Sequence, residues 1–253
     1  MTQPETLAVF ADASFEDAFA KIAPLFKEKS GCSLQLTFGQ SGALRTDIEG
    51  LMPCDVFCSA DEASPAALQK AVKAHELFAF AGNRLVVATR SERRFQNQDW
   101  ADILCDPSTT IGMSTPRVSP EGDWSALLFK NIAKALPGRL GSRIVGQHAV
   151  ALIGGNHTDE QLDRETGAHF MLSHEGIDAA VVFESAAERM KAEGLLLHPI
   201  PDGVCPKIVC WGCFPRTGKA PGSLKKELEA LLLSPEGQTL LQGCGFLPAP
   251  ANA

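Results

Sequence analysis

Short apolar segments that alternate with amphipathic ones limit the fold of this chain more than any other feature. In the first third of the chain, three apolar runs of strand length are separated by stretches with the 3.6-residue period of a helix. Strands joined through helices in this order form a parallel sheet with helices on both faces, so the pattern predicts an α/β protein. The predicted strands here are residues 7–11, 33–38 and 55–60, and the predicted helices are residues 14–27, a segment ending near Glu49 and a segment after Pro65.

The alternation continues toward the C-terminus, apart from a polar stretch over residues 154–164. A chain of 253 residues with 45% hydrophobic side chains suffices for one large domain or two modest ones. Later strands are predicted at residues 79–89, 109–113, 143–147, 179–183, 195–200 and 207–214. Later helices are predicted at residues 99–104, 124–135, 167–174, 223–233 and 235–243.

Composition and charge exclude several classes of protein. No apolar run reaches the length of about eighteen residues that a membrane-spanning helix needs. The net charge is −7 and no basic stripe is present, so we expect no nucleic-acid partner. The N-terminal residues lack the basic region, apolar stretch and cleavage site of a secretory signal. Two alternatives stay open: a cytoplasmic protein, or a chain that starts after a removed signal.

The eight cysteines do not follow a zinc-binding spacing. Cys210 and Cys213 form a C-x-x-C motif, but no second such motif or histidine pair follows at the required distance. The motif lies in an apolar run that reads as a strand. We therefore expect buried thiols, or one disulfide that joins Cys205 to Cys210 or Cys213.

Two predicted strand-to-helix turns carry the residues most suited to binding an anion. Ser14 follows the first strand, and Ser41 follows the second. In a parallel sheet both turns lie at the carboxyl ends of adjacent strands. A hydroxyl and free backbone N–H groups at a helix N-terminus form a ready anion site. The alternative is that each serine only caps its helix, with Ser14 as the N-cap of residues 14–27. A third turn of this form spans residues 114–122.

Motifs of common enzymes are absent from the sequence. It contains no G-x-S-x-G, no P-loop, no G-x-G-x-x-G and no H-E-x-x-H. His169 and His174 are five residues apart, which is a poor spacing for a shared helix face. We therefore expect a binding protein and no catalysis.

Five segments occur in an order that matches one protein family. They are residues 9–14, 38–44, 54–61, 80–86 and 232–238, the last followed by Gly245 and Phe246. With these segments the chain resembles the periplasmic molybdate-binding proteins of ABC transporters over nearly its whole length. The resemblance is weakest between residues 138 and 178.

The resemblance implies a two-lobed periplasmic-binding-protein type II fold, in which each lobe is a mostly parallel sheet flanked by helices. Residues 1–82 with 196–253 would form one lobe and residues 83–195 the other, with the ligand in the cleft between them. The implied ligand is molybdate or tungstate, with no other cofactor. The implied partner is an ABC transporter permease, and the protein would be a periplasmic monomer that does not span the membrane. The implied ligand-binding residues are Ser14, Ser41, Glu121, Gly122, Glu165, Thr166, Phe183 and Ser185.

Two positions depart from the family pattern. Phe183 stands where the family has a tyrosine, so one hydroxyl donor is missing and Ser185 is the candidate to replace it. Glu121 stands where the family supplies a backbone donor. A carboxylate about 4 Å from a dianion costs on the order of 8 kcal/mol at an effective dielectric constant of about 20. Glu121 must therefore point away, be protonated or bind the metal centre directly, as carboxylates do in archaeal tungstate and molybdate relatives.

Other functions remain open on the same fold. A binder of a metal cation or a metal chelate would use Glu121, Glu165, Glu184 and the histidines as ligands. An enzyme such as a transferase would use the anion site for a phosphate. A cytoplasmic anion sensor is the third alternative.

Overall fold

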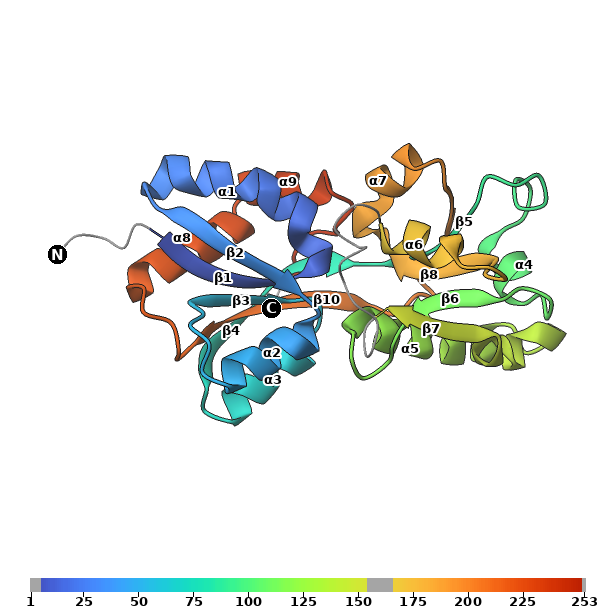
Figure 1. Ribbon diagram of the computed structural model, residues 1–253, viewed down its shortest axis with the longest axis horizontal. Helices are drawn as coiled ribbons and strands as arrows, with labels where there is room; N and C mark the ends of the chain where they lie inside the picture. Colours follow the sequence, from blue (N-terminus) through green and yellow to red (C-terminus); the bar gives the residue numbers. More distant parts are fainter. Residues whose placement is uncertain (1–5, 154–165, 252–253) are drawn as a thin grey trace. The chain divides into compact units, whose positions relative to one another are not determined.

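The computed structural model describes residues 6–153 and 166–251, and it divides into two compact units. The first unit consists of Met1–Asn83 and Ile208–Ala253, and the second of Arg84–Lys207. Each unit contains one five-stranded sheet (Figure 1). Among the described residues, no helix has the length and apolar character needed to cross a membrane.

The sheet of the first unit has the strand order β2-β1-β3-β10-β4. β1 pairs in parallel with β2 and β3, whereas β10 runs antiparallel to both β3 and β4. Four strands therefore point the same way and β10 alone is reversed. The strands are β1 (Thr6–Asp12), β2 (Ser33–Gly39), β3 (Val56–Ser59), β4 (Ala74–Asn83) and β10 (Ile208–Pro215).

Helices cover both faces of this sheet, because successive side chains of a strand point to opposite faces. Leu7, Val9 and Ala11 of β1 pack with α1, α8 and α9, whereas Phe10 packs with α2 and α3 on the other face (Figure 1). The short 3₁₀ helix η1 (Ala13–Phe15) leads into α1. The helices are α1 (Glu16–Ser30), α2 (Ser41–Glu49), α3 (Ala63–Lys70), α8 (Gly222–Leu233) and α9 (Pro235–Gln242).

The second unit repeats this plan with the strand order β7-β6-β8-β5-β9. β6 pairs in parallel with β7 and β8, and β5 is the one reversed strand. α6 and α7 pack on one face and α5 on the other (Figure 1). The strands are β5 (Leu85–Thr89), β6 (Ile111–Ser114), β7 (Ala149–Ile153), β8 (Ala179–Phe183) and β9 (Leu196–Pro199). The helices are α4 (Trp100–Leu104), α5 (Pro120–Ala135), α6 (Gly167–Ser173) and α7 (Ala187–Ala192), with 3₁₀ helices η2 (Leu140–Arg143), η3 (Val145–Gln147) and η5 (Glu184–Ala186).

The predicted α/β architecture is confirmed, but three local predictions are wrong. Residues 79–89 form two strands in different sheets, because the chain passes from one unit to the other at Arg84. Residues 143–147 comprise the end of η2, a turn at Ile144 and η3, and the strand follows them at β7. Residues 196–207 belong to the second unit, because β9 pairs with β5. The boundaries therefore lie after Asn83 and Lys207, instead of after residues 82 and 195.

All eight cysteines are buried thiols, which is the first of the two predicted alternatives, and the disulfide of Cys205 does not form. Burial raises the pKa of the Cys213 thiol to about 12 and also raises that of Cys58. These thiols therefore stay protonated at neutral pH.

In the part of the chain that the structure describes, no group of three or more His, Cys, Asp or Glu side chains is placed to hold a metal ion.

Candidate functional site

The serines of the first two turns converge on a single carboxylate, that of Asp12. Ser14 donates from its backbone N–H and its hydroxyl to Oδ1 of Asp12, over 3.1 and 2.9 Å. Ser41 donates from its N–H and its hydroxyl to Oδ2, over 3.1 and 2.5 Å. A carboxylate has about four lone-pair positions, so these four donors fill the acceptor capacity of Asp12.

The parallel register of β1 and β2 brings the two turns together. Asp12 pairs with Gly39 at the ends of these strands, two residues before Ser41 begins α2. The Ser41 hydroxyl also accepts a hydrogen bond of 3.2 Å from the N–H of Ala60, which follows β3. Three adjacent strand ends are thus joined through one hydroxyl. The prediction that Ser14 caps the first helix is wrong, because Asp12 is the N-cap and Ser14 lies inside η1.

Asp12 is almost completely removed from solvent, with 4% of its surface exposed. Burial raises the pKa of this carboxyl above its ordinary value, and its four hydrogen bonds to Ser41 and Ser14 lower it by less. None of the described hydrogen bonds or ion pairs brings a lysine or arginine to Asp12. Within the part of the first unit that the structure describes, its charge is therefore stabilised by neutral dipoles.

The second unit holds a carboxylate in a similar way at the third turn. Glu121, in the first turn of α5, accepts a hydrogen bond of 2.7 Å from the Ser114 hydroxyl and one of 2.8 Å from the N–H of Phe183. These bonds join the start of α5 to the ends of β6 and β8. The Glu121 carboxylate is therefore directed at donors on the ends of β6 and β8. This orientation disfavours the alternative in which the side chain turns to solvent.

Position 122 requires a glycine because the first turn of α5 packs directly against the backbone of Ser114 and Thr115. A Cβ at this position would lie 2.6 Å from the carbonyl oxygens of Ser114 and Thr115. We expect Gly122→Ala to lower the stability of the second unit by about 1–3 kcal/mol, since the backbone has to shift. Thermal unfolding monitored by circular dichroism measures this loss. Gly138→Ala is the matched control, because nothing lies within 4 Å of a Cβ at Gly138. Equal melting temperatures for both variants would contradict the prediction.

The remaining predicted residues lie in the second unit. Thr166 caps α6 and donates its N–H, over 2.8 Å, and its hydroxyl to the carboxylate of Glu193. Phe183 ends β8 with its ring buried, and Ser185 is buried in η5. Glu165 lies outside the described residues. The structure thus joins Ser14 with Ser41, and Glu121 with Phe183, whereas Thr166 bonds to a residue that we did not predict.

Three residues of these clusters, Asp12, Ser114 and Glu193, were missed by sequence reasoning. Asp12 had a local signal, because an aspartate two residues before a serine at a strand end is a frequent N-cap. Glu193 had none, since it is 27 residues from Thr166. In all three clusters an internal carboxylate accepts hydrogen bonds from a serine or threonine hydroxyl and from a backbone N–H group.

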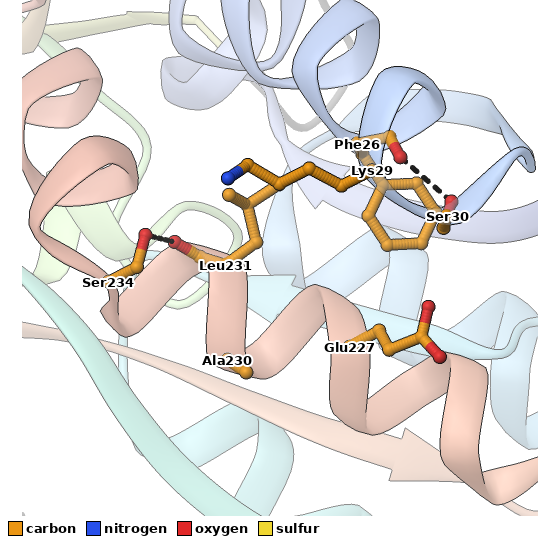
Figure 2. A pocket seen from close by; sticks show the side chains of 7 residues that line it. All are labelled: Phe26, Lys29, Ser30, Glu227, Ala230, Leu231 and Ser234. Atoms are coloured by element: carbon orange, nitrogen blue, oxygen red, sulfur yellow. Dashed lines mark hydrogen bonds between the residues drawn. The ribbon is translucent and has the colours of Figure 1, made fainter.

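A pocket of about 330 Å³ lies elsewhere on the first unit, between α1 and α8 (Figure 2). Its two serines bond to their own helices: Ser30 donates to the carbonyl of Phe26, and Ser234 to that of Leu231 (Figure 2). The one lysine of the lining, Lys29, forms an ion pair of 2.6 Å with Glu236. This pocket is therefore not the site that the strand-end serines define.

Two α/β units with polar donors at their strand ends define a solute-binding protein. The family model of bacterial extracellular solute-binding proteins matches residues 7–247. The chain therefore belongs to this family, which agrees with the resemblance found in the sequence.

Curated relatives support this assignment. The chain is 27% identical over 246 residues to the uncharacterized protein PM1146 of Pasteurella multocida, covering 96% of this chain and 99% of the relative. It is 30% identical over 123 residues to the molybdate-binding protein ModA of Mycobacterium tuberculosis, covering 45% of this chain. The second match spans 47% of ModA, or about half its length.

Solved structures share the fold at low sequence identity. The periplasmic molybdate-binding protein of Azotobacter vinelandii superposes with a TM-score of 0.74 at 18% identity, covering 96% of this chain and all of the other. A substrate-binding domain of a putative molybdenum ABC transporter from Clostridium difficile gives 0.68 at 20% identity, covering 97% and 99%. The sulfate-binding protein SubI of M. tuberculosis gives 0.79 at 17% identity, covering 98% and 88%.

Proposed function

We propose that this chain is the substrate-binding component of an ABC importer and captures a small oxyanion, with molybdate and tungstate as the first candidates. The observation that carries the proposal is the convergence of four neutral donors from Ser14 and Ser41 on one carboxylate. A carboxylate is itself an oxyanion, and its position marks where the donors point. The binding of molybdate by the relative ModA and by the A. vinelandii protein supports this choice of ligand.

The same geometry favours an oxyanion over a metal cation. Asp12 has no acceptor position left for a cation, because four hydrogen bonds already fill it. The serine hydroxyls, by contrast, can rotate toward a new acceptor. Fixed N–H groups at the start of α2 and in η1 then replace part of the hydration shell of an anion. No cationic side chain is needed for such a site.

Asp12 sets the energetic condition for this binding. An ionised carboxylate about 4 Å from a dianion costs on the order of 8 kcal/mol at an effective dielectric constant of about 20. Protonating an aspartate with an ordinary pKa at pH 7 costs about 4 kcal/mol, and less when its pKa is raised, as it is for Asp12. A dianion is therefore bound more easily next to a protonated Asp12 than next to an ionised one.

We expect Ser41→Ala to lower the affinity for molybdate by about tenfold or more, because it removes one donor to a charged ligand. Isothermal titration calorimetry measures the loss. Ser30→Ala is the matched control, since the Ser30 hydroxyl bonds to its own helix in α1. The assignment of Ser41 would be wrong if both variants bound molybdate as the unmodified chain does.

The cellular context follows from the same proposal. As a member of an extracellular solute-binding family, the chain would act in the periplasm, as a monomer that delivers its ligand to a membrane permease. It would catalyse no reaction. Copurification of the chain with the ABC transporter permeases of its host, in the presence and absence of molybdate, tests the partnership.

A further inference from the structure

We propose that Asp12 makes capture of the oxyanion dependent on the uptake of one proton. The inference rests on the proposed function, since it concerns the same donors. It assigns to Asp12 the role of an internal anion that occupies the site when no ligand is bound. The side chain would then set both the pH range of capture and the preference among anions.

The first argument is that Asp12 and a ligand need the same hydrogen-bond donors. Both hydroxyl protons of Ser14 and Ser41 are directed at Asp12, and each serine has only one. The two backbone N–H groups are directed at it as well. An oxyanion that takes these donors leaves the buried carboxylate without the bonds that stabilise its charge. An unpaired charge at a site with 4% exposure is unfavourable.

The second argument is that no cation is paired with Asp12 among the residues of the first unit that the structure describes. β2 carries no titratable side chain, and α2 has Arg45, which lies 3.7 Å from Glu49 of the same helix. Burial and then the charge of Asp12 raise the pKa of Cys210 on β10, so this thiol is uncharged. The lysines of α1 are directed elsewhere: Lys21 donates to the Cys244 thiol over 3.3 Å, Lys29 pairs with Glu236 over 2.6 Å, and Lys27 is exposed. The elements around Asp12 also carry acidic groups, among them Glu16, Asp17, Asp47 and Asp61.

Protonation of Asp12 removes the competition between its carboxylate and the ligand for the same hydrogen-bond donors. The free site holds an ionised Asp12, a dianion arrives, and one proton comes from solvent to Asp12. The site charge then changes from −1 to −2 instead of to −3. The new O–H can donate to an oxygen of the ligand, while the serine groups turn from Asp12 to the other oxygens. Dihydrogen phosphate, which is a monoanion present near neutral pH, can bring the proton itself and also leaves the site charge at −2.

The direction of the pH effect follows from this exchange. Below the pKa of Asp12 in the free protein, the site already carries the proton and affinity does not change with pH. Above that pKa, one proton must be taken up, so the affinity for molybdate falls by about tenfold for each unit of rising pH. Because burial raises this pKa above its ordinary value, the fall begins at a higher pH than for an exposed aspartate.

Calorimetry of molybdate binding tests the proposal on the full chain. Titrations over about pH 6 to 8, each in two buffers with different heats of ionisation, count the protons taken up per ligand. We expect the uptake by the unmodified chain to rise with pH toward one proton, because the fraction of ionised Asp12 rises with pH. Asp12→Ala should take up none and should bind at least about tenfold more tightly at the upper end of this range. Asp61→Asn is the matched control, because Asp61 bonds to Ser59 and Ser64 and not to the two site serines. It should keep the proton uptake.

The outcomes separate the two proposals. Molybdate binding without proton uptake, and with the same affinity in Asp12→Ala, overturns the role of Asp12 and leaves the proposed function intact. Failure of the unmodified chain and of Asp12→Ala to bind molybdate, tungstate, sulfate or phosphate overturns both. If Asp12→Ala does not fold, the proton count of the unmodified chain still decides, and Asp12→Asn replaces it as the variant without a titrating group.

Discussion

Replacing Phe15 with alanine is expected to lower the free energy of unfolding of the first unit by about 3–5 kcal/mol. The ring is fully buried and lies at the centre of an aromatic cluster. It stacks on Phe246 with the ring centres 4.8 Å apart, and it contacts Phe80 and Phe19 at 5.1 and 6.3 Å. Alanine would leave a cavity between η1, β4 and the C-terminal segment, because a close-packed core collapses only in part.

Urea unfolding monitored by the fluorescence of Trp211 measures this loss in the first unit. Trp211 lies in β10, whereas Trp100 and Trp124 lie in the second unit and are best replaced by phenylalanine in all proteins compared. Phe15→Leu is the matched control and should lose only about 1–2 kcal/mol, because it fills most of the space. A loss below about 1 kcal/mol for Phe15→Ala would show that the cluster does not stabilise the unit as we expect.

A loss of similar size, about 3–5 kcal/mol, is expected for Asp55→Ala. Oδ2 of Asp55 accepts the N–H of Ala8 over 2.9 Å, and Oδ1 accepts that of Ala220 over 2.7 Å. The ammonium of Lys225 lies 4.0 Å from the same carboxylate, and both side chains are buried. Removing Asp55 leaves a buried charge and two backbone donors without their acceptor, and each of these is unfavourable.

The same urea experiment tests Asp55, with two comparisons. Adding Lys225→Met to Asp55→Ala should recover part of the loss, because it removes the unpaired charge. Glu236→Gln breaks an exposed ion pair of 2.6 Å with Lys29 and should change the stability by less than about 1 kcal/mol. If the double variant were no more stable than Asp55→Ala, the buried charge of Lys225 would not be the cause of the loss.

The sequence was sufficient to predict the order of most elements. Apolar runs with clear ends became strands within a residue or two, as in β8, which spans the predicted residues 179–183. The split of residues 79–89 was not predictable, because both halves are apolar and only the passage to a second sheet separates them. Residues 143–147 have the composition of a strand, but tertiary packing places them in 3₁₀ turns.

The candidate site was predicted in part. Ser14 and Ser41 were identified because strand-to-helix turns of a parallel sheet meet at one edge, and their hydroxyls do bond to a common carboxylate. That the acceptor is Asp12 was not predicted, because capping and anion binding use the same residue types. Glu193 was missed because its partner Thr166 is close only in the folded chain.

The position of β10 determines when the first unit can become complete. This strand comes from the last quarter of the chain, yet it lies between β3 and β4, which are made early. During synthesis the early strands β2, β1 and β3 cannot join β4 until residue 215 has emerged, whereas the second unit is already whole at residue 207. The second unit should therefore acquire protection from hydrogen exchange before β3 and β4 of the first unit do, because these two strands are joined only through β10.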